Sequence, residues 1–191
     1  AAMFHHPLLH AFVECALKGA SVQHSEACLT LLHFLMLLVT EGVNSSRYNK
    51  TRGRVPDPAF VAVLEQCLGK YGQSLMTALV ANLSGAVPPS SHSYVILVLE
   101  ALLLYGGRDA LQWLKATLRN GRALGVPLNC VNPSVEEFFR FMVNGVDKRD
   151  PRVLRKGMQA WANACQKAVR GQGFGQSGDE GGENQPRDPK G

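Results

Sequence analysis

Apolar residues recur along this chain at steps of three and four, the spacing that places side chains on one face of an α-helix. The first such segment covers residues 7–19, and the second runs from the region of Cys28 to Gly42. A glycine closes each segment, which is a common way for a helix to end. The short polar stretch between the two segments predicts a helical hairpin.

A polar, basic stretch follows at residues 43–58, where glycine and proline interrupt the pattern and predict a linker. Asp57 and Pro58 have the residue types of an N-cap and a first-turn proline. The helix that starts there keeps its apolar period as far as Gly85, although Gly69 and Gly72 weaken it. The pattern fits either one bent helix or two helices in series.

Prolines and glycines also divide the second half of the chain. A start signal at residues 88–91 precedes Tyr94–Tyr105, which is apolar on nearly all sides and therefore predicts a helix buried on more than one face. Gly106 and Gly107 end it, and another helix starts at Arg108. After a linker at 125–133, two further helices are predicted; they cover residues 134–146 and 150–170.

No strand pattern survives beside these helices, so the fold class is all-α. Helices of this length, joined by short turns in pairs that each expose an apolar face, are typical of an α-solenoid of the HEAT or armadillo type. A compact helical bundle is the alternative. We expect residues 1–170 to form the helical repeats. Residues 171–191 are rich in glycine and acidic side chains and predict a disordered tail.

Length and composition narrow the class of protein further. The chain has 191 residues, of which 46% are hydrophobic and 18% charged, which suits one compact domain or a slice of a larger one. Its amino terminus has neither an initiator methionine nor the order of a signal peptide, so we interpret it as the cut edge of a longer chain. The longest apolar runs are short of the ~20 residues that a membrane span needs.

The residues that could carry chemistry do not form a catalytic or metal-binding pattern. His6 and His10 lie four apart, as do His24 and Cys28, but no third ligand joins either pair. The five cysteines contain no C-x-x-C pair, which favours buried thiols in a reducing compartment. No nucleophile motif or phosphate-binding glycine loop is present. We therefore expect no enzyme activity, no metal and no cofactor.

The candidate site residues are cations in two clusters. The formal net charge is +5, which is too dilute to indicate nucleic-acid binding by itself. Trp113 and Trp161 follow apolar helical stripes and predict core positions rather than base-stacking platforms, so no direct nucleic-acid contact is expected. The residues expected to contact an acidic or phosphorylated partner are Arg47, Lys50, Arg52 and Arg54 in the linker, and Arg152, Arg155 and Lys156 at the start of the last helix.

Several blocks of the sequence resemble a known family. They are Leu8-Leu9-x2-Phe12-Val13-x-Cys15-Ala16, Gln23-His24-x3-Cys28, Leu68-Gly69-x2-Gly72-Gln73-x-Leu75, Val87-Pro88-Pro89 and Gln112-Trp113-Leu114. Over about residues 4–170 the chain is similar to the carboxyl-terminal HEAT repeats of transportin-SR and importin-13 receptors, members of the importin-β superfamily.

The resemblance implies a nuclear import receptor that shuttles between cytoplasm and nucleus through the nuclear pore. Such a receptor carries protein cargo, contacts FG nucleoporins weakly and releases its cargo when Ran-GTP binds. For transportin-SR the cargo class is Arg/Ser-rich splicing factors, recognised through an arginine-rich helix that this chain does not contain. The alternatives are a helical-repeat scaffold or adaptor without transport activity, and a module that binds RNA or phosphoprotein through Arg47–Arg54.

Overall fold

The computed structural model describes residues 58–86, 88–124, 131 and 133–173, together with the single positions Ala11, Cys15 and Thr30. Every regular element in this part of the chain is helical, and no strand occurs in it, so the all-α prediction is confirmed there. Ala11, Cys15 and Thr30 are helical, as predicted at those positions. The rest of the two predicted amino-terminal helices, the predicted linker up to residue 57 and the predicted tail beyond residue 173 lie outside the described residues.

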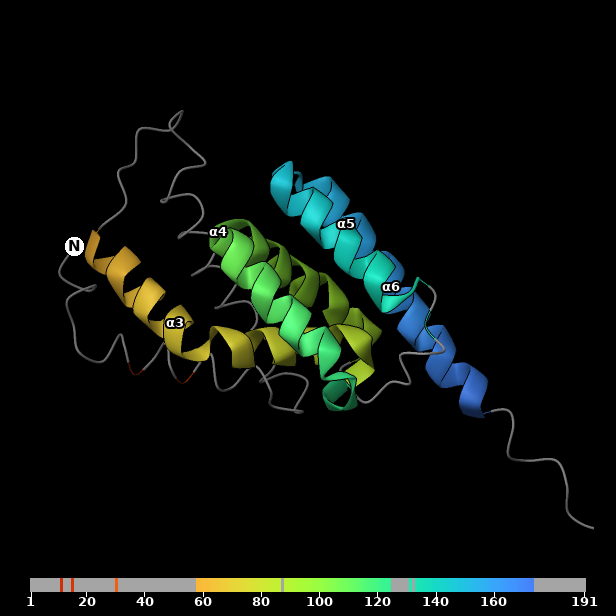
Figure 1. The fold of residues 1–191 in the computed structure, drawn as a ribbon. Coiled ribbons are helices and arrows are strands. Elements are labelled where there is room, and N and C mark those ends of the chain that lie inside the picture. The colour runs from red at the N-terminus through yellow and green to blue at the C-terminus, as the bar shows by residue number, and fades with distance from the viewer. Residues whose placement is uncertain are drawn as a thin grey trace, which may run out of the picture.

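Helix α3 spans Pro58–Ala81, the segment for which the sequence predicts either one bent helix or two helices in series. It is a single helix that changes direction along its length (Figure 1). Gly72 lies inside it, against the indole ring of Trp113. A Cβ atom on Gly72 would lie only 2.4 Å from Cη2 of Trp113, so only glycine leaves room for the indole ring.

Two short segments lead from α3 into the next helix. The π-helical segment Asn82–Ala86 contains Gly85, whose φ of 123° few other residues adopt. A 3-10 turn at Pro89–Ser91 then precedes α4, which spans His92–Arg119. The proline pair therefore opens the helix as the sequence predicts.

Gly107 divides α4 into the two helical runs predicted on either side of the Gly106-Gly107 pair. Its backbone has φ 53° and ψ −119°, a conformation that requires glycine. The first run covers residues 92–106 and the second covers 108–119.

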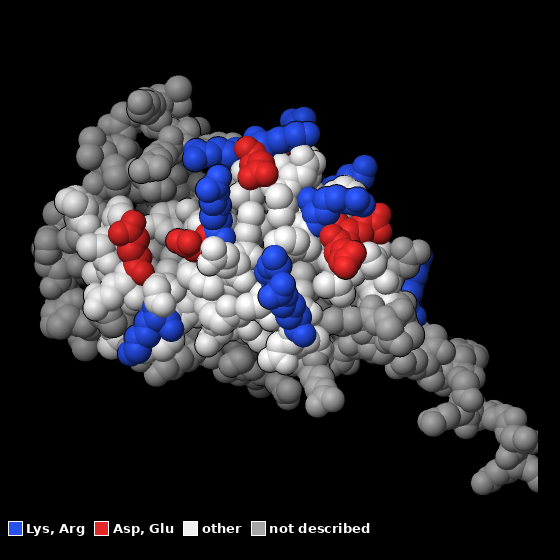
Figure 2. All heavy atoms as spheres, in the orientation of Figure 1, with Lys and Arg blue, Asp and Glu red and all other residues white. Residues whose placement is uncertain are grey.

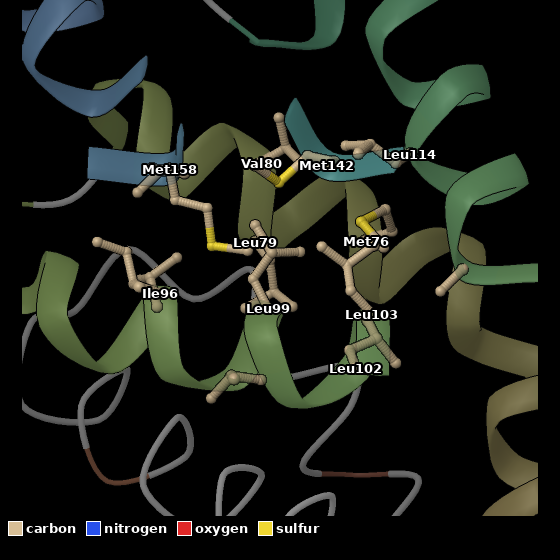
Figure 3. Close-up of a cluster of buried hydrophobic side chains, with 14 of the residues drawn as sticks. Met76, Leu79, Val80, Ile96, Leu99, Leu102, Leu103, Leu114, Met142 and Met158 are labelled. Carbon is tan, nitrogen blue, oxygen red and sulfur yellow. The ribbon is translucent and has the colours of Figure 1, made fainter. Parts of the chain in front are cut away.

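The two runs of α4 travel in opposite directions. Figure 3 shows Leu79 of α3 beside Leu99 and Met76 beside Leu103, so the first run is antiparallel to α3. In the second run the order is reversed. Trp113 lies against Gly72, and the hydroxyl oxygens of Thr117 and Thr77 are 3.0 Å apart. The chain therefore folds back at Gly107 and packs both runs against α3.

Helices α5 (Val135–Asp147) and α6 (Pro151–Gly173) form a second hairpin, with the two helices side by side in Figure 1. Ser134 caps α5, since its Oγ accepts a hydrogen bond from the backbone N–H of Glu137 at 3.3 Å. Asp150 caps α6 and accepts from the N–H of Arg152 at 2.8 Å. Helix α6 continues to Gly173, past the predicted end at residue 170.

One buried cluster joins all four helices. The run Tyr94–Tyr105 is buried on more than one face, as predicted. The largest fully buried side chains are Trp161, Phe138, Leu75, Met76, Leu79, Leu83, Leu99, Leu102, Leu103 and Leu114, several of which are drawn in Figure 3. Antiparallel helices around a shared core occur both in α-solenoids and in compact bundles, so the solenoid stays a prediction.

None of the helices in residues 58–86, 88–124 and 133–173 combines the length and the apolar character needed to cross a bilayer.

Candidate interaction surface

The structure describes three of the seven predicted partner-binding cations. Arg47, Lys50, Arg52 and Arg54 lie outside the described residues. Arg152, Arg155 and Lys156 lie in the first two turns of α6, and all three side chains are exposed. Lys148 and Arg149, in the preceding turn, are exposed too. We call these five cations, Lys148, Arg149, Arg152, Arg155 and Lys156, the basic turn.

Arg155 has a partner on another helix of the protein. Its guanidinium group donates two hydrogen bonds to Glu100 on α4, one from Nε to Oε2 and one from Nη2 to Oε1 at 2.9 Å. This bond to Glu100 raises the pKa of Arg155 above its ordinary value. Arg155 therefore joins α6 to the first run of α4, a role that its place in a basic cluster did not suggest.

The sequence around Glu100 indicates that this residue has a charged partner. It is the one charged residue in the apolar run Tyr94–Tyr105, and its side chain is only 10% exposed. A carboxylate in such surroundings needs a hydrogen-bonded cation, so a partner could have been expected. The sequence does not reveal which cation, because Arg155 lies 55 positions away.

The backbone of the basic turn has an uncommon conformation at Arg149. Its φ is 50°, the left-handed region that usually favours glycine. The N–H of Asp150 donates to the carbonyl of Gly145 at 2.9 Å, and the N–H of Arg149 donates to that of Val146 at 3.1 Å. These two bonds form a Schellman motif that ends α5, with arginine at the position where glycine is commonest.

We therefore expect Arg149→Gly to stabilise the protein, by about 0.5–1 kcal/mol, because glycine adopts a positive φ without steric cost. Lys148→Gly is the matched control. Lys148 has φ −82° and ψ −8°, so glycine there should lower stability instead. Urea unfolding of both variants measures the two changes, and a loss of stability in Arg149→Gly would contradict the prediction.

Helix α6 is held to the turn after α3 by a buried hydrogen bond. The indole N–H of Trp161 donates to Oγ of Ser84 at 3.1 Å, and both residues are fully buried. The ring of Trp161 also stacks on Phe138 of α5, with centroids 4.6 Å apart. These contacts fix the position of α6, and hence the direction in which the basic turn faces.

The described thiols have different surroundings. Cys67 and Cys165 are buried, in agreement with the sequence prediction, whereas Cys15 is exposed, which was not expected. Burial raises the pKa of the Cys165 thiol to about 11, although a hydrogen bond with Ser84 acts in the opposite direction. Such a thiol stays protonated at neutral pH and is a poor nucleophile.

The raised pKa predicts that stability falls in alkaline solution. In the unfolded chain the thiol loses its proton near 9.0, whereas in the folded protein it keeps it to about 11. The folded state is therefore disfavoured as the pH rises from 9 to 11, by up to about 2 kcal/mol. Urea unfolding at pH 8 and pH 10.5 measures this change. Between these two pH values the free energy of unfolding should fall less for Cys165→Ala than for the unsubstituted protein. Equal falls would contradict the assignment.

In the part of the chain that the structure describes, His, Cys, Asp and Glu side chains form no group of three that could hold a metal ion. On its surface the described part of the chain presents the basic turn and two exposed apolar side chains, Phe141 on α5 and Val169 on α6.

Comparison with known proteins gives one informative relative. The chain is 30% identical over 114 residues to Transportin MOS14 of Arabidopsis thaliana, a match that covers 59% of this chain and 11% of the relative. This indicates a distant relationship to the transportins of the importin-β superfamily. The match thus corresponds to a small part of the relative's length. No family model matches the chain, and no solved structure matches it.

Proposed function

We propose that this chain is the carboxyl-terminal part of a nuclear import receptor of the importin-β superfamily. The 30% identity to a transportin over 114 residues is the observation that carries the proposal. The all-helical architecture supports it, because consecutive antiparallel helices around a continuous core are the building units of such receptors. We assign no catalytic step to this part of the protein.

In this proposal the helices described above cap the end of a HEAT superhelix. A solenoid changes curvature through small shifts between neighbouring repeats, so two ligands that prefer different curvatures exclude one another. Protein cargo binds when the solenoid has one curvature. Ran-GTP prefers the other curvature, so its binding releases the cargo. The receptor contacts FG nucleoporins weakly and shuttles between cytoplasm and nucleus.

The cargo class proposed is Arg/Ser-rich splicing factors, and binding assays with the full-length protein test this directly. An immobilised Arg/Ser-rich splicing factor, in phosphorylated and unphosphorylated forms, is incubated with the receptor, and Ran-GTP or Ran-GDP is then added. We expect the receptor to bind and to be released by Ran-GTP alone.

Two other outcomes would each contradict part of this proposal. Binding that neither form of Ran reverses would favour the alternative, a helical scaffold or adaptor without transport activity. If the receptor binds Ran-GTP but neither form of the splicing factor, the cargo class is contradicted and the receptor function is not.

A further inference from the structure

The basic turn gathers charge at one end of the described molecule. Its five cations lie within residues 148–156, and all are exposed. Figure 2 shows blue side chains gathered at the end where α5 meets α6 in Figure 1, with fewer red ones among them. The carboxylates beside the cations, Asp147, Asp150 and Glu100, are fewer, so this end stays positively charged.

Two cations of this turn lie where the helix itself does not favour them. Arg155 is paired with Glu100, but Arg152 and Lys156 project from the amino-terminal turns of α6, which carry no acidic side chain. A helix dipole is positive at this end, so cations there are electrostatically unfavourable. Arg149 adds a conformational cost through its positive φ. Side chains kept at such costs, in one place, suggest that this surface binds something.

An exposed aromatic ring belongs to the same hairpin. Phe141 of α5 is 37% exposed and lies against Gly157, the residue after Lys156. A Cβ atom on Gly157 would lie 3.1 Å from Cβ of Phe141 and 2.6 Å from Cε of Met142, so the two helices touch closely here. The seam between them therefore offers an apolar contact close in sequence to the cations of α6.

We propose that the basic turn and Phe141 form a docking surface for an acidic peptide segment of a partner protein, one with an apolar side chain among its carboxylates. The guanidinium group of Arg152 can bind a carboxylate in a bidentate manner, Lys156 adds a second positive charge, and Phe141 supplies the apolar contact.

A peptide suits this surface better than a nucleic acid. Asp147 and Asp150 lie beside the cations in the sequence and would repel some of the closely spaced phosphates of a nucleic-acid backbone. The discrete carboxylates of a peptide can be placed to avoid them. In addition, Phe141 is the one large aromatic side chain of the described residues that is clearly exposed, whereas single-stranded nucleic acids usually need several stacking rings.

Fluorescence anisotropy with the full chain tests this proposal. The probe is a labelled 12-residue peptide of Glu and Asp with a central Leu, compared with a Lys-rich peptide and with oligouridine of the same charge as the acidic probe. We expect the acidic probe to bind, with an affinity that falls as salt rises. The Arg152→Glu, Lys156→Glu double variant should lose about tenfold in affinity.

The matched control reverses the charge of two exposed lysines elsewhere. This double variant, Lys115→Glu with Lys167→Glu, should change the affinity by less than about twofold. Phe141→Ala should lower the affinity for the acidic probe without changing its salt dependence, because this substitution removes an apolar contact only. Equal losses in the two charge-reversed proteins would overturn the proposal, since binding would then follow net charge alone. Tighter binding of oligouridine than of the acidic peptide would overturn it in favour of a nucleic-acid surface.

Discussion

Replacing Trp161 with alanine is expected to lower the free energy of unfolding by about 3–5 kcal/mol, the largest effect of any substitution considered for this protein. The side chain is fully buried and touches three elements. It lies on α6, stacks on Phe138 of α5, and donates its indole N–H to Ser84 in the segment after α3. Its removal leaves a large cavity and takes away the hydrogen bond to Ser84. Urea unfolding monitored by circular dichroism measures the loss.

Two further variants separate the hydrogen bond from the packing. Ser84→Ala should cost about 1–3 kcal/mol, because it leaves the buried indole N–H without its acceptor. Combined with Trp161→Phe, it should cost less than the sum of the two single changes, since the bond can be lost only once. Lys167→Ala on the exposed side of α6 is the control, with a change within about 0.5 kcal/mol. Strict additivity of the double variant would contradict the hydrogen bond.

The second large effect is expected at Gly72. Alanine is normally the better helix former, yet Gly72→Ala should destabilise the protein by about 1–3 kcal/mol. Its Cβ atom would lie 2.4, 2.6 and 2.7 Å from three carbons of the Trp113 ring. The ring is a rigid plane that also borders Gly106, so it can yield only by withdrawing from α3.

Gly69 provides the control in the same helix. It lies three positions earlier, and a Cβ atom there would meet nothing within 4 Å. Gly69→Ala should therefore stabilise the protein by about 0.5–1 kcal/mol through helix propensity alone. Thermal or urea unfolding of the two variants compares them directly. If both substitutions stabilise the protein, Trp113 does not pack over Gly72 as described.

The helices of the described region could be predicted because their signals are local. The apolar period, the proline start at residues 88–91, the Ser134 cap and the stop at Gly106-Gly107 each act within a few positions of the feature they produce. The same glycine pair also marks where α4 reverses. Helix α6 ends at Gly173, three residues later than the sequence predicts, because the exact end of a helix depends on weak local preferences.

Features that depend on distant residues could not be predicted in this way. No residue near Arg155 in the sequence indicates that it binds Glu100. Likewise, no residue near Gly72 indicates that Trp113 occupies the space that a side chain there would fill. The left-handed conformation of Arg149 is also hidden, since no glycine or asparagine marks the turn. Of the predicted interaction residues, the structure places Arg152, Arg155 and Lys156 together, and their binding role stays a prediction.

The measurement that tests the central claim most directly is capture of the endogenous protein on immobilised Ran. Ran is loaded with a non-hydrolysable GTP analogue or with GDP, and bound material is probed with an antibody against residues 58–173. An import receptor should be retained by the GTP form alone, as a band much larger than 20.7 kDa. Equal retention by both forms, or by neither, would contradict the transport function.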